Sequence, residues 1–228
     1  MMSIRKKMTQ VQWVRGIALP SVMVILLLSS LLVLTAWRSV WLNELLLRAR
    51  ADAVRSQWAA DAALHAALDD VLQHARFSQT SVSTEVALRH VMGTSDQHHV
   101  FFPKDASQLM VLRQRLGADD CRVGICAPSK PLPSQVSYWQ NRASSAMVIP
   151  PDQSLSPSGN ACYWVEVFLR TESDQTPAWI YRITAMVKGL KAAQPVVLQA
   201  IWLSDAKANA ETSNATTGQW VSWARLHD

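Results

Sequence analysis

The stretch IALPSVMVILLLSSLLVLTAW, Ile17–Trp37, is twenty-one residues long and carries no charge. A helix of this length spans roughly 32 Å at about 1.5 Å per residue, which matches a bilayer core of about 30 Å. We therefore expect one membrane-spanning helix at residues 17–37. The alternative is a secretory signal peptide, whose apolar region is usually about 7–15 residues long and ends in a small-residue cleavage site, and this stretch fits neither criterion.

The charges that flank this stretch predict its orientation. Residues 1–16 contain four of the 22 basic residues (Arg5, Lys6, Lys7 and Arg15) and none of the 17 acidic ones. The positive-inside rule places such an N-terminus in the cytoplasm and the chain from Arg38 onward in the periplasm. The net charge of +5 therefore comes almost entirely from residues 1–16, and the remainder of the chain is nearly neutral. This distribution argues against a basic face that binds nucleic acid.

The sequence predicts that the helix continues well beyond the membrane. No Gly or Pro occurs between Trp37 and Arg76, so nothing obliges the helix to end at the bilayer surface. Apolar residues recur at steps of three or four, first at Leu47, Ala51, Val54, Trp58 and Ala62, and then at Leu64, Leu68, Val71, Leu72 and Ala75. We expect residues 38–76 to form the periplasmic half of the helix, with this stripe covered by a globular head, residues 77–228. The charged residues between these positions, including Asp70, are expected on a solvated face.

The head is expected to combine short helices, a long loop and strands. Asp105–Gln108 has the form of a capping box before Leu109, Leu112 and Leu116, with Gly117 after the helix, and a shorter helix is expected between Ser83 and Gly93. Residues 126–159 contain six of the ten prolines and are expected to be irregular and to lie on the surface. Residues 162–169, 179–187 and 196–203 predict an antiparallel meander against the long helix, and residues 220–226 a final edge strand. The fold class is therefore α+β.

Three cysteines lie on the predicted periplasmic side, where disulfides persist. Cys121 and Cys126 are close enough in sequence to close a small loop in which Gly124 allows the turn, and this pairing is favoured. Pairing of Cys162 with either of them stays open. A zinc site is not expected, because the spacing lacks a CxxC pair.

No catalytic or cofactor-binding motif is found in the sequence, which argues against an enzyme. His90, His98 and His99 could suggest a metal site, but only Asp96 stands near them at ligand spacing. We expect these histidines in a solvent-exposed loop.

The N-terminal sixty residues resemble the PilX family of minor pilins. Arg15-Gly16-Ile17-Ala18-Leu19, the aliphatic run, Thr35–Ser39, Glu44 and the alanine-rich Trp58–Leu64 follow one another in the family's order. Three elements of the head are also similar to the family: Tyr163–Glu166, Tyr181–Ala185 and the Cys121–Pro128 region. The resemblance implies a pilin-like fold, with a long helix on a small antiparallel sheet and a loop-rich insertion. It also implies cleavage after Gly16 by a prepilin peptidase and N-methylation of Ile17, whereas a flexible juxtamembrane hinge is the alternative interpretation of Gly16.

One position departs from the common pilin pattern. Most type IV pilins carry a glutamate five residues into the mature chain, where this sequence has Ser21. The family's glutamate pairs with the terminal amine of a neighbouring subunit, and the related secretion pseudopilin that lacks it is assigned to the tip. Ser21 therefore suggests a tip-proximal subunit. Pro20, the fourth mature residue, is compatible with the first turn of a helix.

The resemblance implies a single-pass inner-membrane protein that later reaches the pilus (fimbrium) tip. Its implied role is to prime type IV pilus assembly and so support twitching motility and adhesion. The implied partners are other minor pilins, a tip adhesin, the major pilin and the inner-membrane assembly platform, with no cofactor. The alternatives are the tip pseudopilin of a type II secretion system and a bitopic periplasmic scaffold with an uncleaved anchor.

Overall fold

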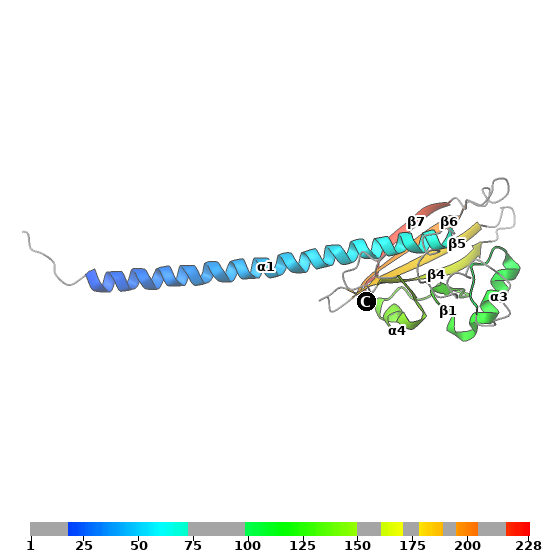
Figure 1. Cartoon of the computed structure of the whole chain (residues 1–228), viewed down its shortest axis with the longest axis horizontal. Coiled ribbons are helices and arrows are strands. Elements are labelled where there is room, and N and C mark those ends of the chain that lie inside the picture. Colours follow the sequence, from blue (N-terminus) through cyan, green and yellow to red (C-terminus); the bar gives the residue numbers. More distant parts are fainter. Residues whose placement is uncertain (1–17, 73–98, 150–160, 171–177, 189–194, 205–217) are drawn as a thin grey trace, which may run out of the picture. The chain divides into compact units, whose positions relative to one another are not determined.

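A computed structural model of the 228-residue chain describes residues 18–72, 99–149, 161–170, 178–188, 195–204 and 218–228. The chain divides into two units, residues 1–50 and 51–228. The helix α1 (Ala18–Val71) begins in the first unit and ends in the second (Figure 1). Its predicted end near Arg76 and the predicted helix between Ser83 and Gly93 lie outside the described residues.

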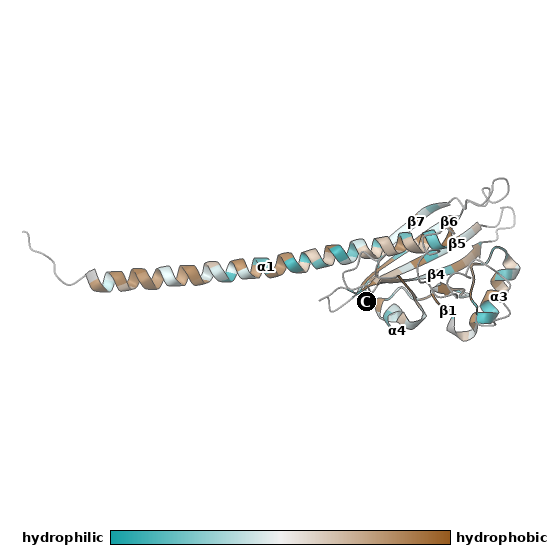
Figure 2. Ribbon diagram, viewed as in Figure 1, coloured by the Kyte–Doolittle hydropathy of each residue, from teal (hydrophilic) through white to brown (hydrophobic). Residues whose placement is uncertain are grey.

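In the first unit, α1 exposes all of its large apolar side chains. From Leu19 to Leu47 their exposed fractions lie between 44% and 74%, and Figure 2 shows this part of the helix as largely hydrophobic. The hydroxyls of Ser29, Ser30, Thr35 and Ser39 donate to carbonyls one turn earlier, so these polar groups are satisfied within the helix itself. Within the described residues, α1 is the one helix long and apolar enough to cross a membrane.

In the second unit, α1 buries a face that differs in part from the predicted one. The buried residues are mostly small: Ala59, Ala60, Ala63, Leu64, Ala67 and Val71. The prediction was correct for Leu64 and Val71. It was wrong for Leu47, Val54 and Trp58, which are 64%, 53% and 67% exposed, and for Ala51, which is also exposed. The stripe was assigned from the larger apolar side chains, whereas a sheet can approach a helix more closely along its alanines.

Asp70 also differs from the prediction, because it is buried rather than solvated. Only 5% of Asp70 is exposed, and its Oδ2 accepts a hydrogen bond of 2.7 Å from the hydroxyl of Tyr163. A buried carboxylate needs such partners. This bond therefore ties the end of α1 to the sheet.

The sheet is mixed and has the strand order β1-β2-β4-β5-β6-β7, with β3 paired to β4. Its long strands are β4 (Ala161–Arg170), β5 (Ala178–Val187), β6 (Val196–Ser204) and β7 (Gly218–Arg225), each antiparallel to the next. These confirm the predicted meander and edge strand. The short strands β1 (Cys121–Arg122), β2 (Ile125–Cys126) and β3 (Met147–Val148) were not predicted, nor was the parallel pairing of β2 with β4.

Helix α3 (Ala106–Leu116) has the predicted ends and the predicted apolar face. The Asp105 carboxylate accepts from the Gln108 amide, while the Gln108 side chain accepts from the Lys104 amide, one residue earlier than in a regular capping box. Hydrogen bonds from the Ser107 hydroxyl and the Gln108 amide lower the pKa of Asp105. A 3₁₀ turn, η1 (Gly117–Asp119), follows.

Each face of the sheet is covered by its own buried cluster. On one face, Tyr163, Val165 and Val167 of β4 share a core with α1 and with Leu109, Leu112 and Leu116 of α3. On the other face, Cys162 and Trp164 pack with Leu132, Val136 and Trp139. Successive residues of a strand point to opposite faces, so both faces of β4 are buried.

The second cluster corrects the expectation of an irregular surface loop at residues 126–159. This segment contains the helix α4 (Val136–Asn141), the 3₁₀ turn η2 (Ala143–Ser145) and β3. Trp139 is fully buried and its ring centroid lies 4.9 Å from that of Trp164. Prolines do restrict the segment, but the apolar residues between them form a small core of their own.

Candidate functional site: the disulfide hairpin and the buried ion pair

A disulfide between Cys121 and Cys126 closes the hairpin of β1 and β2, as the sequence favoured. The two turn residues, Val123 and Gly124, have φ angles of +46° and +74°. Positive φ at both central residues is typical of a type I′ turn, which matches the twist of a two-residue hairpin. A β-branched residue such as Val123 rarely adopts this conformation, so the surrounding contacts must hold it there.

Gly124 supplies those contacts because it is wedged between two strands. Its amide donates to the Ser145 carbonyl at 2.7 Å, and its carbonyl accepts from the Val165 amide at 2.7 Å. A Cβ at this position would lie 2.6 Å from the Cβ of Met147 and 2.9 Å from the carbonyl oxygen of Tyr163. The hairpin therefore docks against β3 and β4 only with glycine at this position.

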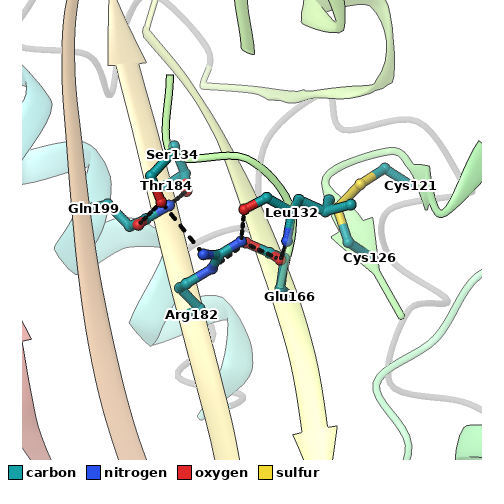
Figure 3. A network of polar contacts seen from close by, with 8 residues as sticks. All are labelled: Cys121, Cys126, Leu132, Ser134, Glu166, Arg182, Thr184 and Gln199. Atoms are coloured by element: carbon teal, nitrogen blue, oxygen red, sulfur yellow. Dashed lines mark hydrogen bonds and ion pairs between the residues drawn. A yellow bond between two sulfur atoms is a disulfide. The ribbon is translucent and has the colours of Figure 1, made fainter. Parts of the chain in front are cut away.

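A buried ion pair crosses β4 and β5 close to this hairpin (Figure 3). Glu166 and Arg182 are direct cross-strand neighbours. The guanidinium donates from Nε to Oε2 and from Nη2 to Oε1, both at 2.6 Å. Glu166 is fully buried and Arg182 is 8% exposed, so neither charge has ready access to solvent.

The ion pair also binds the loop that follows the hairpin. Glu166 Oε1 accepts from the Leu132 amide at 3.0 Å, and Arg182 Nη2 donates to the Leu132 carbonyl at 2.6 Å. Two residues later, the Ser134 hydroxyl donates to Gln199 of β6 at 3.1 Å, and the Gln199 amide donates to the Thr184 hydroxyl at 2.9 Å. Three strands thus hold the proline-containing loop in one position (Figure 3).

The electrostatics of this pair are those of a structural element. Burial raises the pKa of Glu166, and the hydrogen bonds and charge of Arg182 oppose that rise. The two side chains form two hydrogen bonds with each other and one each with the backbone of Leu132, which is the geometry that a buried ion pair requires. The arrangement can position the surface around Pro131 and Ser134, both of which are exposed.

The residues singled out from the sequence lie at different places. Gly16 and Ile17 are outside the described residues, and Ser21 is exposed in the first turns of α1. Cys162 is the unpaired cysteine, and it shares a buried cluster with the Cys121–Cys126 disulfide. Burial raises the pKa of the Cys162 thiol to about 12.

The predicted exposed histidine loop is wrong for His99 and lies outside the described residues for His90 and His98. Only 3% of His99 is exposed, its ring stacks at 6.5 Å from that of Phe101, and its carbonyl accepts from Arg115. In the part of the chain that the structure describes, no group of three His, Cys, Asp or Glu side chains could hold a metal ion.

The Glu166–Arg182 pair was not predicted, although both residues lie in predicted strands. A usable signal was present: both charges stand in apolar strands at positions that alternate with the buried apolar ones. Assigning them to each other requires the register between β4 and β5, and the connection between these strands is too long to specify that register.

Comparisons of the chain with protein-family models, with curated proteins and with solved structures found no match.

Proposed function

We propose that this chain is a PilX-type minor pilin that primes or promotes type IV pilus assembly from a position at or near the pilus tip. In this role it supports twitching motility and adhesion. Its partners are other minor pilins, a tip adhesin, the major pilin and the inner-membrane assembly platform. It is a substrate of the prepilin peptidase and has no enzymatic activity of its own.

The observation that carries the proposal is the difference between the two halves of α1. Up to Leu47 the helix exposes aliphatic side chains and hydroxyls that are satisfied within the helix. From Ala59 to Val71 it buries small side chains against a sheet. A subunit that is stored in a membrane and then transferred into a helical filament needs both of these surfaces on one helix.

A second feature supports the same role. Beyond Trp37, the large apolar residues of the first unit remain exposed: Val40, Trp41, Leu42, Leu45, Leu46 and Leu47. Together with the preceding stretch they carry exposed apolar side chains along about 29 residues of α1, or roughly 43 Å, interrupted by Arg38, Asn43 and Glu44. This length exceeds a bilayer core of about 30 Å. Exposed apolar surface of this extent marks an interaction site, and neighbouring pilin helices would cover it.

The direct test is the identity of the mature N-terminus. Mass spectrometry of the membrane-resident full chain is expected to find N-methylated Ile17 in a strain with active prepilin peptidase and an intact leader in a peptidase-deficient strain. A Gly16→Val variant is expected to keep its leader in both strains. An intact Met1 or Met2 in the peptidase-positive strain would contradict the proposal and favour an uncleaved anchor.

A further inference from the structure

An open groove lies between the outer half of α1 and the edge strand β7. It has a volume of about 400 Å³ and is lined by Val54, Gln57, Trp58, Asp61 and Trp223. The four α1 residues follow the pattern i, i+3, i+4 and i+7 and therefore lie along one side of the helix. This side differs from the buried face of Ala60, Ala63 and Ala67.

The groove presents an unusual amount of exposed aromatic surface. Trp58 is 67% exposed and Trp223 is 51% exposed. All eight residues of β7 are exposed, and β7 ends the sheet order after β6. Tryptophans that are about half exposed in the lining of a groove are typical of binding hot spots, because covering them removes a large apolar area from solvent.

The polar lining indicates which chemistry the groove accepts. Asp61 adds a carboxylate to the lining that holds the two indoles, and Gln57 adds an amide. Among the described residues, the basic group within 4.0 Å of Asp61 is His65, whose Nε2 lies 4.0 Å from Oδ2, beyond hydrogen-bond distance. Indole faces attract cations and a carboxylate pairs with them, so the lining suits a positive charge that carries apolar neighbours.

We propose that this groove binds an arginine or lysine, flanked by apolar side chains, from a segment of a different protein. The cation lies against the indoles of Trp58 and Trp223 and pairs with Asp61, while the flanking apolar side chains contact Val54. A carboxylate at this place disfavours an anionic lipid headgroup. The inference concerns a surface of the head and goes beyond the proposed role in pilus assembly, since it does not depend on how the N-terminus is processed.

The experiment is site-specific photo-crosslinking of the full-length chain in its native cells. p-Benzoyl-phenylalanine replaces Gln57 in the groove, and Met110 of α3, which is 64% exposed, is the control position. The attached peptide is then sequenced by mass spectrometry. We expect the Gln57 adduct to contain a peptide of a second protein with an arginine or lysine within four residues of an apolar side chain.

Matched variants test the charge. Added to the Gln57 probe, Asp61→Asn is expected to lower the adduct yield about fivefold, the loss of one exposed charge-assisted contact. Asp52→Asn, which removes a partly exposed carboxylate of the same helix outside the groove lining, is expected to leave the yield unchanged. Because the Asp61 side chain is 43% exposed, Asp61→Asn keeps the fold, and protection of the buried Cys162 thiol from iodoacetamide checks this.

Four results would overturn the proposal. They are an adduct yield at Gln57 no higher than at Met110, an attached peptide without a basic residue, an adduct with lipid or with a second copy of this chain, and a yield that Asp61→Asn does not change. An attached basic-apolar peptide would support the proposal even if Ile17 were not the mature N-terminus, so the two tests can fail separately.

Discussion

At the scale of single residues, the head depends on a few polar groups placed inside apolar surroundings. Glu166 and Arg182 are held between strands by two hydrogen bonds of 2.6 Å and share the Leu132 backbone. Asp70 and Tyr163 make a similar buried contact between α1 and β4. Such pairs specify one arrangement of the chain, because a shift of either partner leaves an unpaired buried charge or hydroxyl.

We expect Arg182→Ala to lower the free energy of unfolding by about 3–5 kcal/mol, since it leaves Glu166 buried without its counter-charge. The double variant Glu166→Leu, Arg182→Met is expected to cost much less, because it removes both charges and keeps their volume. Urea unfolding of the full chain in detergent, followed by tryptophan fluorescence, measures both.

Lys130→Ala provides the control, because this cation lies exposed in the same loop region. A change within about 0.5 kcal/mol is expected there. Equal effects of Lys130→Ala and Arg182→Ala would show that the buried pair contributes nothing specific.

Cys162 should be chemically inert in the folded protein. The reactive species of a cysteine is its thiolate, and burial raises the pKa of Cys162 to about 12, so the thiol stays protonated at pH 8. Without reductant, iodoacetamide is expected to leave the native chain unlabelled at pH 8 and to label one cysteine, Cys162, in urea. Peptide mapping that finds Cys121 or Cys126 labelled would contradict the disulfide assignment.

At the scale of elements, small side chains decide how α1 meets the sheet. The residues at the contact are mostly alanines, with Leu64 among them and Val71 at the C-terminal end of the helix. The larger Val54 and Trp58 are left on the exposed side, where they line the groove. The same part of α1 thus packs against the sheet with one side and lines the groove with another.

Ala60→Leu should test this assignment of faces. Ala60 is fully buried, so three additional carbon atoms must displace the sheet, and we expect a loss of about 1–3 kcal/mol of folding free energy. Ala53→Leu is the matched control on the exposed side of the same helix and should change stability by less than about 0.5 kcal/mol. Urea unfolding compares the two, and a larger loss for Ala53→Leu than for Ala60→Leu would contradict the assignment of Ala60 to the buried face.

At the scale of the whole molecule, the proposed role requires few copies that act at initiation. Deleting the protein is expected to reduce the number of pili strongly and to change the subunit composition of the remaining pili only slightly. Pilus counts in the deletion strain and quantitative mass spectrometry of sheared pili measure the two effects. Copy numbers comparable to those of the major pilin, or unchanged pilus numbers, would contradict the tip assignment.

Ser21 gives a second test at this scale. A carboxylate at that depth in the membrane costs about 2.5–3.5 kcal/mol unless it is paired. A tip subunit does not need the pairing with a neighbour's terminal amine that a shaft subunit makes. Ser21→Glu is therefore expected to leave pilus number unchanged or to lower it slightly, with Ser21→Ala as the control. A clear gain in pilus number would show that this chain takes part in the shaft.

Much of the fold could be predicted from the sequence because local patterns decide it. An uncharged run of twenty-one residues with no helix breaker after it can only be a long apolar helix. Alternation of apolar residues predicted β4, β5 and β6, and a capping residue and a glycine bounded α3. Two cysteines with four residues between them favoured their own pairing.

Tertiary structure alone decided which surfaces meet. Four features join residues that are distant in sequence or depend on the close approach of two elements. They are the buried face of α1, the parallel pairing of β2 with β4, the burial of Trp139 and His99, and the Glu166–Arg182 pair. Such contacts depend on register and shape, which a local pattern does not contain. The groove beside Trp58 exists for the same reason: the sheet packs against alanines, and the larger apolar side chains of α1 remain outside.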